Sequence, residues 1–354
     1  MVRGRRWHRC CARRGVRNDP RFLQTCALAL LCVFPLQSAA ATTARKAARN
    51  PRSGLSSSGA NDASRTPRLA PASASSSSVL RVQVLLDRTH FSPGEIDGRY
   101  GGNTRRAVAA FNEAHRLGGG EKVDAKTWAA LNRDTAPVVV PYVLTPGDVV
   151  GPFEKLPLET PDRAKLSALG FESVVESLGE RFHASPGLLR ALNPGAAFDA
   201  GASIQVPNVE RVPLEKAKGI TVRVSESDHS AVAVGPDGAV LARYPATVGS
   251  EHDPLPLGEW KINGVATDPS FNYNPELFWD SEPGDEKAKL PPGPNNPVGV
   301  VWIDLSKPHY GIHGTPEPAT IGGKTSHGCI RLTNWDAREL GGLVSPGAPA
   351  HLVK

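Results

Sequence analysis

At 354 residues, the chain is longer than one ordinary domain, so two or three modules are expected. Its 35 glycines and 32 prolines argue against an all-helical protein. The formal net charge of +6 belongs to the start of the chain, because residues 1–41 carry eight arginines and one acidic residue, Asp19. The remainder is close to neutral and has no electrostatic footprint for phosphates, so nucleic acid is not expected as a partner.

Residues 1–41 have the layout of a signal peptide. An arginine-rich start precedes the apolar stretch Cys26–Leu36, and the small residues from Ser38 to Ala41 offer a cleavage site. The apolar stretch is shorter than the roughly 20 residues that a membrane-spanning helix needs, although a retained anchor is the alternative. This layout predicts export to the periplasm, in association with the cell wall.

Two segments follow the leader. Residues 42–78 are rich in Ala, Ser, Arg and Pro and predict a disordered linker. Residues 79–135 predict three short helices, the second of which opens with the capping residues Asn103 and Thr104. Its turn I-D-G-x-Y-G, its helix T-R-x-A-V-x-x-F and its end T-W-x-x-L resemble the peptidoglycan-binding-1 family, which implies a small all-α module.

Residues 142–208 resemble a diverged LysM repeat. The run Y-V-L-T-P-G-D from Tyr142 resembles its opening strand and turn, and residues 178–208 resemble its helices and closing strand. About twenty-five residues intervene where a LysM repeat has very few. The resemblance implies a small α+β module, which either recognises glycan or serves as a spacer.

The pattern becomes β from residue 218. Ile220, Val222 and Val224 alternate with polar residues, which indicates strands with one buried face. The long stretch from Thr267 to Pro297 is rich in Pro, Gly and Asn. A loop of that length is typically the lid or rim of a site.

A lone cysteine sits between histidines and glycines in the last part of the chain. Four of the five cysteines lie in the leader, so export leaves only Cys329, which is either inert or reactive. A cysteine nucleophile needs a base to take its proton and return it to the leaving amine. His313 precedes Cys329 by 16 residues, a spacing that suits two adjacent strands joined by a loop. The N–H groups of Gly328 and Cys329 are candidates for an oxyanion pocket.

His327 allows two further interpretations. On a regular strand it would share a face with Cys329, so it is either the base itself or a residue that fixes the loop. A metal site formed by His313, His327 and Cys329 is the competing chemistry. A fourth ligand and the usual metal-binding spacings are missing from the sequence, so neither a metal nor a cofactor is expected.

The blocks H-G-T at 313–315 and S-H-G-C-I-R-L at 326–332 resemble the signature of the L,D-transpeptidase (YkuD) catalytic domain. The resemblance covers residues 218–354 and implies a mainly-β, β-sandwich-like fold in a multidomain chain. It implies Cys329 as the nucleophile and His313 as the base, oriented by Gly314 or Thr315. The loop and oxyanion residues it implies are Ser326, His327 and Gly328.

Other side chains near these blocks are candidates for contact with substrate. Arg331 either binds a substrate carboxylate or forms a structural salt bridge. Tyr273 and Trp279, in the long loop, are expected to contact substrate, whereas Trp302 is expected in the core. The remaining polar residues, Asn274, Asn295 and Asp336, are expected to satisfy turns or to start a helix.

The resemblance implies acyl transfer on a peptidoglycan tetrapeptide stem of the meso-diaminopimelate type. Cys329 would release D-alanine and form a thioester, which an amine then resolves as a crosslink or as attachment of a wall protein. Water as the acceptor would make the enzyme an L,D-carboxypeptidase, and a degenerate site would leave only a wall-binding protein. The resemblance also implies acylation by carbapenems.

Overall fold

The structure is a computed structural model that describes residues 54–64, 76–282, 284–323 and 326–354. The predicted signal peptide lies outside the described residues. Within those residues, no helix is both long and apolar enough to cross a membrane.

Four helices form the first part of the described chain: α1 Ser57–Asn61, α2 Ser77–Arg88, α3 Gly102–Ala114 and α4 Ala125–Leu131. Ser76 caps α2 and Asp124 caps α4, each accepting from a backbone N–H of the first turn. Leu80, Phe111 and Leu131 are buried between the helices. The three predicted helices of 79–135 are therefore present, as α2, α3 and α4.

Two expectations for this region are wrong. Residues 54–64, predicted as part of a disordered linker, contain α1, which packs on α2 and buries Ala60. The small residues of α1 permit this approach, since a Cβ at Gly59 would lie 3.0 Å from Ser77 Oγ. Asn103 does not cap α3, because the helix begins at Gly102. Its side chain instead donates to the Ile321 carbonyl at 2.8 Å.

The next part of the chain begins and ends with a strand. Its elements are β1 Val139–Val143, α5 Pro146–Val149, α6 Thr160–Arg163, α7 Val174–Arg181, α8 Pro186–Leu192 and β2 Ser203–Pro207. The two strands pair antiparallel, with Val139 opposite Pro207. Buried residues of this part and of the helices before it form one continuous apolar cluster. A shared core is expected physically, since segments this short bury little surface alone.

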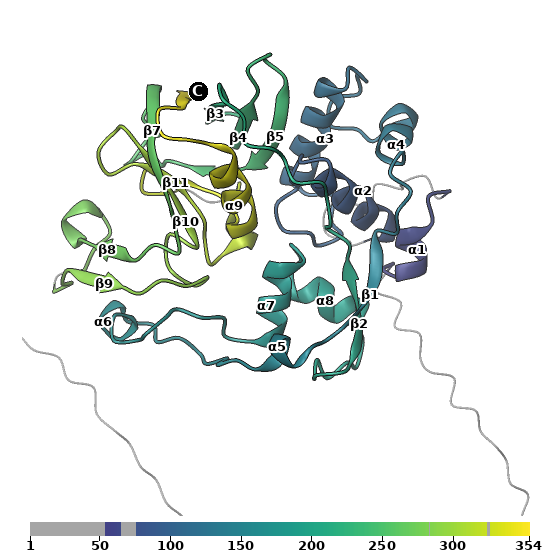
Figure 1. The fold of residues 1–354 in the computed structure, drawn as a ribbon, viewed down its shortest axis with the longest axis horizontal. Coiled ribbons are helices and arrows are strands. Elements are labelled where there is room, and N and C mark those ends of the chain that lie inside the picture. Colours follow the sequence, from purple (N-terminus) through teal and green to yellow (C-terminus); the bar gives the residue numbers. More distant parts are fainter. Residues whose placement is uncertain (1–53, 65–75, 283, 324–325) are drawn as a thin grey trace, which may run out of the picture. The chain divides into compact units, whose positions relative to one another are not determined.

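The rest of the chain is built around a nine-stranded sheet. Figure 1 labels several of its strands. In spatial order its strands are β5 Val240–Pro245, β4 Ser230–Val234, β3 Thr221–Ser225, β13 Pro349–Val353, β7 Gly258–Thr267, β10 Val301–Leu305, β11 Gly311–His313, β12 Ile330–Arg331 and β6 Thr247–Val248. Only Ala246 separates the two edge strands, β5 and β6, in the chain. The sheet must therefore curl back on itself, as in a barrel, and this part of the chain is mainly β as predicted.

Helix α9, Asn334–Leu343, packs on β10 and β11 and closes a second apolar cluster. Thr333 caps it, and Asp336 lies in its first turn, so the expectation that Asp336 starts a helix is confirmed. The long stretch from Thr267 to Pro297 is only partly a loop. It contains a hairpin of β8 Phe271–Tyr273 and β9 Ala288–Leu290, with the 3-10 helix Pro275–Leu277 after β8.

Buried polar side chains join α9 to the first helical region. Ser92 Oγ donates to Asp336 Oδ2 at 2.9 Å, and Arg211 bridges Asp87 and Glu339. Asp336 is fully buried, and burial followed by the charge of Asp87 raises its pKa to about 8.

We expect the unfolding free energy of Asp336→Asn to fall less than that of the wild type as the pH rises. The folded-state pKa of Asp336 lies above that of the unfolded chain, so its contribution is full at low pH and is lost as the pH rises to about 8. Between pH 5 and pH 9, the variant should lose less unfolding free energy than the wild type, by about 1–3 kcal/mol. Urea unfolding at both pH values checks this, and an unchanged pH dependence would contradict it.

Candidate active site

Cys329 and His313 lie at the ends of two neighbouring parallel strands, since His313 is the last residue of β11 and Cys329 directly precedes β12. Ile312 of β11 pairs with Ile330 of β12, and His313 pairs with Arg331. Both isoleucines are fully buried in the sheet's apolar cluster. Because side chains alternate across a strand, His313 and Arg331 point to the face opposite the isoleucines. The prediction of adjacent strands from the 16-residue spacing is confirmed.

The His313 imidazole has a fixed orientation. Its Nδ1–H donates to the Gly314 carbonyl at 2.6 Å, because a carbonyl can only accept. Nε2 is thereby left as the acceptor. The ring stacks on Trp302 of β10, with centroids 5.5 Å apart and planes 17° from parallel. Trp302 was expected in the core, but it is half-buried on the His313 side, because it stands directly opposite His313 in the register.

Burial favours the neutral form of both reactive groups. It lowers the pKa of His313, which is 4% exposed, to about 4, against the opposing hydrogen bond to Gly314. Burial also raises the pKa of the Cys329 thiol, although a hydrogen bond from the Gly311 backbone and the charge of Arg331 oppose the rise. The thiol donates to the His309 carbonyl at 3.7 Å. The site therefore suits a thiol that loses its proton during the attack. It does not favour a thiolate–imidazolium ion pair in the resting enzyme.

The segment before Cys329 is held by its own backbone and by two neighbours. Ser326 Oγ donates to the Cys329 carbonyl at 2.6 Å, and Ser326 N donates to the Gly249 carbonyl at 2.9 Å. Gly328 has a φ of +90°, and a Cβ there would lie 2.8 Å from Tyr310 Cε1. A side chain at residue 328 would be strained in its backbone and would collide with the Tyr310 ring.

The contacts of His327 favour a loop-fixing role over that of the base. Arg331 Nη2 donates to its Nδ1 at 3.5 Å, and its Nε2–H donates to Asp280 Oδ1 at 2.9 Å, so both nitrogens are engaged. The expected alternation with Cys329 does not apply, because the positive φ of Gly328 interrupts the extended backbone. His327 instead joins the loop to the hairpin segment that carries Phe278, whose ring centroid is 5.1 Å away.

The candidate substrate contacts have different surroundings. Trp279 is 57% exposed, stacks on His252 at 4.4 Å, and lies 5.8 Å from the His327 ring. Tyr273 donates through its hydroxyl to Asp285 at 2.9 Å, so it contributes to the hairpin itself. Arg331 forms no ion pair with any carboxylate in the described part of the chain. Thr315 accepts from Glu317 N at 3.2 Å, and the imidazole is oriented by Gly314.

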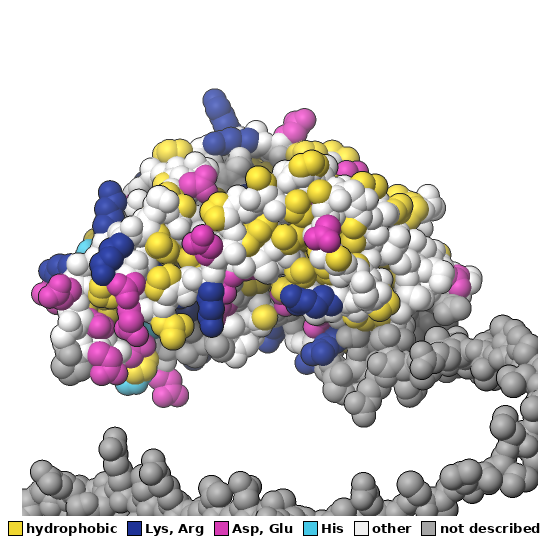
Figure 2. Space-filling view, turned by 90° about the horizontal axis from the view of Figure 1, so that it is seen from below, with side chains coloured by type: hydrophobic (Ala, Val, Ile, Leu, Met, Phe, Trp, Pro, Cys, Tyr) yellow, Lys and Arg dark blue, Asp and Glu magenta, His cyan; other side chains and the backbone are white. Residues whose placement is uncertain are grey.

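The hairpin is rich in exposed acidic residues. In Figure 2, acidic side chains gather at the left end of the view, the end where Figure 1 shows β8 and β9. The exposed carboxylates of this segment are Glu276, Asp280, Glu282, Asp285 and Glu286. Such a rim attracts positively charged groups more than anionic ones.

The comparisons with known proteins place the site in a family. Residues 219–352 match the model of the L,D-transpeptidase catalytic domain, and residues 75–131 match that of a peptidoglycan binding domain. The L,D-transpeptidase YkuD of Bacillus licheniformis is 31% identical over 182 residues, which cover 49% of this chain and 89% of that protein. The chain belongs to the L,D-transpeptidase family. It is therefore a cysteine-dependent acyltransferase.

A second curated relative agrees with this assignment. The YkuD protein of Bacillus subtilis is 30% identical over 178 residues, covering 49% of this chain and 89% of that one. A solved L,D-transpeptidase from Mycobacterium smegmatis shares 19% identity over 43% of this chain and 73% of its own. Its TM-score is 0.32, which is too low for a comparison of the two folds.

Sequence reasoning did not single out several residues of the transpeptidase site. Tyr310 covers Gly328, and the charge of Asp253 acts on the Cys329 thiol. Asn334 lies against Gly314, the residue after His313. Asp253 and Asn334 come from segments apart from the two histidine-containing blocks, so only the folded chain brings them to the site. Within the described residues, no group of His, Cys, Asp and Glu side chains suits a metal ion.

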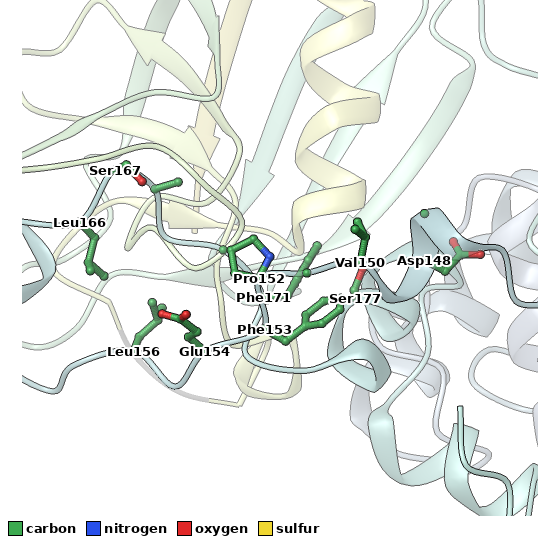
Figure 3. A pocket seen from close by; sticks show the side chains of 14 residues that line it. Asp148, Val150, Pro152, Phe153, Glu154, Leu156, Leu166, Ser167, Phe171 and Ser177 are labelled. Atoms are coloured by element: carbon green, nitrogen blue, oxygen red, sulfur yellow. The ribbon is translucent and has the colours of Figure 1, made fainter. Parts of the chain in front are cut away.

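A cavity of about 410 Å³ lies away from Cys329, in the segment between β1 and α7 (Figure 3). Figure 3 shows Phe153 and Phe171 beside Val150 and Pro152 along its wall. The wall itself contacts the transpeptidase domain, because Leu169, which lies between two lining residues, donates through its N–H to the Pro292 carbonyl at 2.9 Å. The Asn295 side chain, expected to satisfy a turn, donates to the Gly170 carbonyl and to Glu176.

Proposed function

We propose that this L,D-transpeptidase uses Cys329 as its nucleophile and His313 as its general base on a peptidoglycan tetrapeptide stem of the meso-diaminopimelate type. The parallel pairing of β11 with β12 carries the proposal. In this register His313 stands opposite Arg331, two residues after Cys329, which favours a thiol and an imidazole close to each other at the ends of these strands. The bond from Nδ1–H to Gly314 supports the role of Nε2 as the atom that takes the proton.

Acylation follows from the neutral starting pair. As the Cys329 sulfur adds to the carbonyl between the diamino acid and D-alanine, the thiol proton passes to His313 Nε2. The N–H groups of Gly328 and Cys329 are proposed to stabilise the oxyanion. When the tetrahedral intermediate collapses, the C–N bond breaks and D-alanine leaves with the proton from Nε2. A thioester on Cys329 remains.

An amine then resolves the thioester. It loses a proton to His313 while adding to the thioester carbonyl, the C–S bond breaks, and the Cys329 sulfur regains a proton. The acidic hairpin favours the approach of an amine that is protonated in solution, either from a second stem or from a wall-protein lysine, and this amine releases one proton to solvent before it attacks in its neutral form. Arg331, whose guanidinium has no carboxylate partner in the described chain, is proposed to bind a substrate carboxylate. Water as acceptor makes the same site an L,D-carboxypeptidase.

The segments before residue 218 are proposed to hold the enzyme on its substrate. The match to a peptidoglycan binding domain supports this for residues 75–131. The order β1, α7, α8, β2 supports a LysM-like module over residues 142–208, with an insertion between β1 and α7. The contacts of Leu169 and Asn295 favour a spacer role for this insertion. The arginine-rich leader supports secretion to the periplasm.

The test is a product analysis combined with a covalent inhibitor. Purified protein and a defined disaccharide-tetrapeptide should yield D-alanine and a crosslinked dimer, read by mass spectrometry. Shortened monomers in place of dimers would favour the carboxypeptidase. Incubation with a carbapenem should add one drug mass to the intact protein, and peptide mapping should locate it on Cys329. A protein with neither product nor adduct would be a wall-binding protein without activity.

A further inference from the structure

Asn334 lies against Gly314, the residue after His313, and is almost completely buried, at 1% exposure. It is the first residue of α9, directly after the capping residue Thr333. Helix α9 packs on β11, the strand that carries His313. The helix start therefore brings this side chain to the end of that strand.

The side-chain oxygen of Asn334 fits between two glycines. A Cβ on Gly314 would lie 2.2 Å from Asn334 Oδ1, and one on Gly299 would lie 2.0 Å from it. The same oxygen accepts from Val300 N at 3.3 Å. The carboxamide therefore lies directly on the backbone of Gly314, in space that any larger residue at 299 or 314 would fill.

Gly314 is the residue that orients His313. Its carbonyl accepts the imidazole Nδ1–H at 2.6 Å, while its N–H donates to the Val301 carbonyl at 3.2 Å. Movement of this peptide unit would weaken the bond to Nδ1 and permit the other tautomer. The imidazole would then present an N–H to the Cys329 thiol instead of an acceptor.

The other end of the carboxamide anchors Asn334 itself. Its Nδ2 donates to the Pro294 carbonyl at 3.2 Å and to Glu180 Oε2 at 3.5 Å. These partners belong to the end of the hairpin stretch and to α7. The amide is thus fixed from two sides, which makes it a rigid support for the Gly314 peptide.

We propose that Asn334 is a positioning residue that holds the Gly314 carbonyl and thereby keeps His313 in the tautomer with the proton on Nδ1. The inference rests on the proposed function, in which His313 Nε2 receives the thiol proton. Asn334 contacts neither substrate nor the reacting atoms. It acts on the reaction only through Gly314.

The first test is Asn334→Ala. We expect kcat with the tetrapeptide to fall about 10- to 100-fold, because a small displacement of the base is enough for such a loss, while KM changes less than twofold. In ¹⁵N NMR spectra, the wild-type His313 should show a protonated Nδ1 and an unprotonated Nε2. The variant should show a mixture of tautomers. Asn263→Ala is the control, since the Asn263 side chain also donates two hydrogen bonds but lies on β7, where its partners are Asp304 and Leu305.

Asn334→Asp is the second test and serves even if the alanine variant does not fold. A protonated carboxyl at residue 334 can accept from Val300 N and donate to the Pro294 carbonyl. An ionised carboxylate would instead be repelled by that carbonyl and by Glu180. We expect its kcat, relative to the wild type, to fall at least fivefold from pH 5 to pH 8.

The outcomes separate this inference from the proposed function. If folded Asn334→Ala keeps the wild-type kcat and His313 tautomer while Cys329→Ala is inactive, the positioning role is wrong and the proposed function stands. If Cys329→Ala remains active, the proposed function fails. The tautomer measurement needs no turnover and still decides the role of Asn334.

Discussion

Cys329→Ala should abolish release of D-alanine and of crosslinked product from a defined tetrapeptide, with a rate loss of at least about 1000-fold. The alanine removes the atom that forms the thioester and disturbs little else, since the thiol's hydrogen-bond partners are backbone groups of His309 and Gly311. Binding to isolated sacculi should be unchanged, because the segments proposed to bind the wall precede residue 218. The measurement is the initial rate by product mass spectrometry beside a sacculus pull-down.

The thiol can also be tested in the wild-type protein. Cys329 is the only cysteine after residue 41, so an alkylating reagent modifies one site in a chain without its leader. Alkylation should stop turnover to the same extent as Cys329→Ala and leave wall binding intact. Full turnover by the alkylated protein would show that another residue performs the chemistry.

His313→Gln should lower kcat by about 100- to 10,000-fold, the usual contribution of a general base. In the wild type, kcat/KM should rise as the pH rises through about 4, where the buried imidazole loses its proton. It should then stay level between pH 5.5 and pH 7.5. A histidine with the ordinary pKa of about 6.5 would instead lose roughly tenfold at pH 5.5.

His351→Gln is the matched control for this series. His351 is half-buried on β13, where it pairs with Arg223 and Glu259, away from the reactive strands. Its substitution should change neither the rate nor the acid side of the profile. If kcat/KM of the wild type fell as the pH dropped below about 6.5, His313 would be more solvated than its burial indicates. An active His313→Gln would give the role of base to another residue.

The features that could be predicted are those that depend on residues close together in the sequence. The spacing of His313 and Cys329 indicated two adjacent strands, because the intervening glycine-rich stretch is long enough to return the chain alongside itself. The alternation at Val222 and Val224 indicated a sheet with one buried face, and Asp336 was expected at a helix start. In each case, neighbours in the sequence determine the structure.

The parts that were not predictable depend on contacts between distant segments. The residue type and position of Asn103 predict a helix cap. Its side chain instead binds the Ile321 carbonyl, more than two hundred residues later in the chain. Trp302 sits in an apolar strand and was expected in the core, but the register of β10 with β11 turns it toward His313. Asn334 follows the signature at a position with no local pattern. Its role depends on two glycines from other segments.

The extent to which the reactive pair is neutral also came only from the fold. The ordinary pKa values of cysteine and histidine already leave both groups mainly uncharged near neutral pH, with a minor charged fraction of each. Burial moves the pKa of His313 down and that of Cys329 up, so both changes favour the uncharged forms. The thiol should therefore resist modification at pH 7 and react faster as the pH rises.

The most direct measurement is the mass of the enzyme during turnover. The protein is mixed with tetrapeptide substrate, quenched in acid within the first turnover before a second stem resolves the thioester, and digested for peptide mapping. The account predicts that the peptide containing Cys329 carries the mass of the substrate minus D-alanine, and that Cys329→Ala carries none. Product formation without an adduct on that peptide, or an adduct on a different residue, would contradict it.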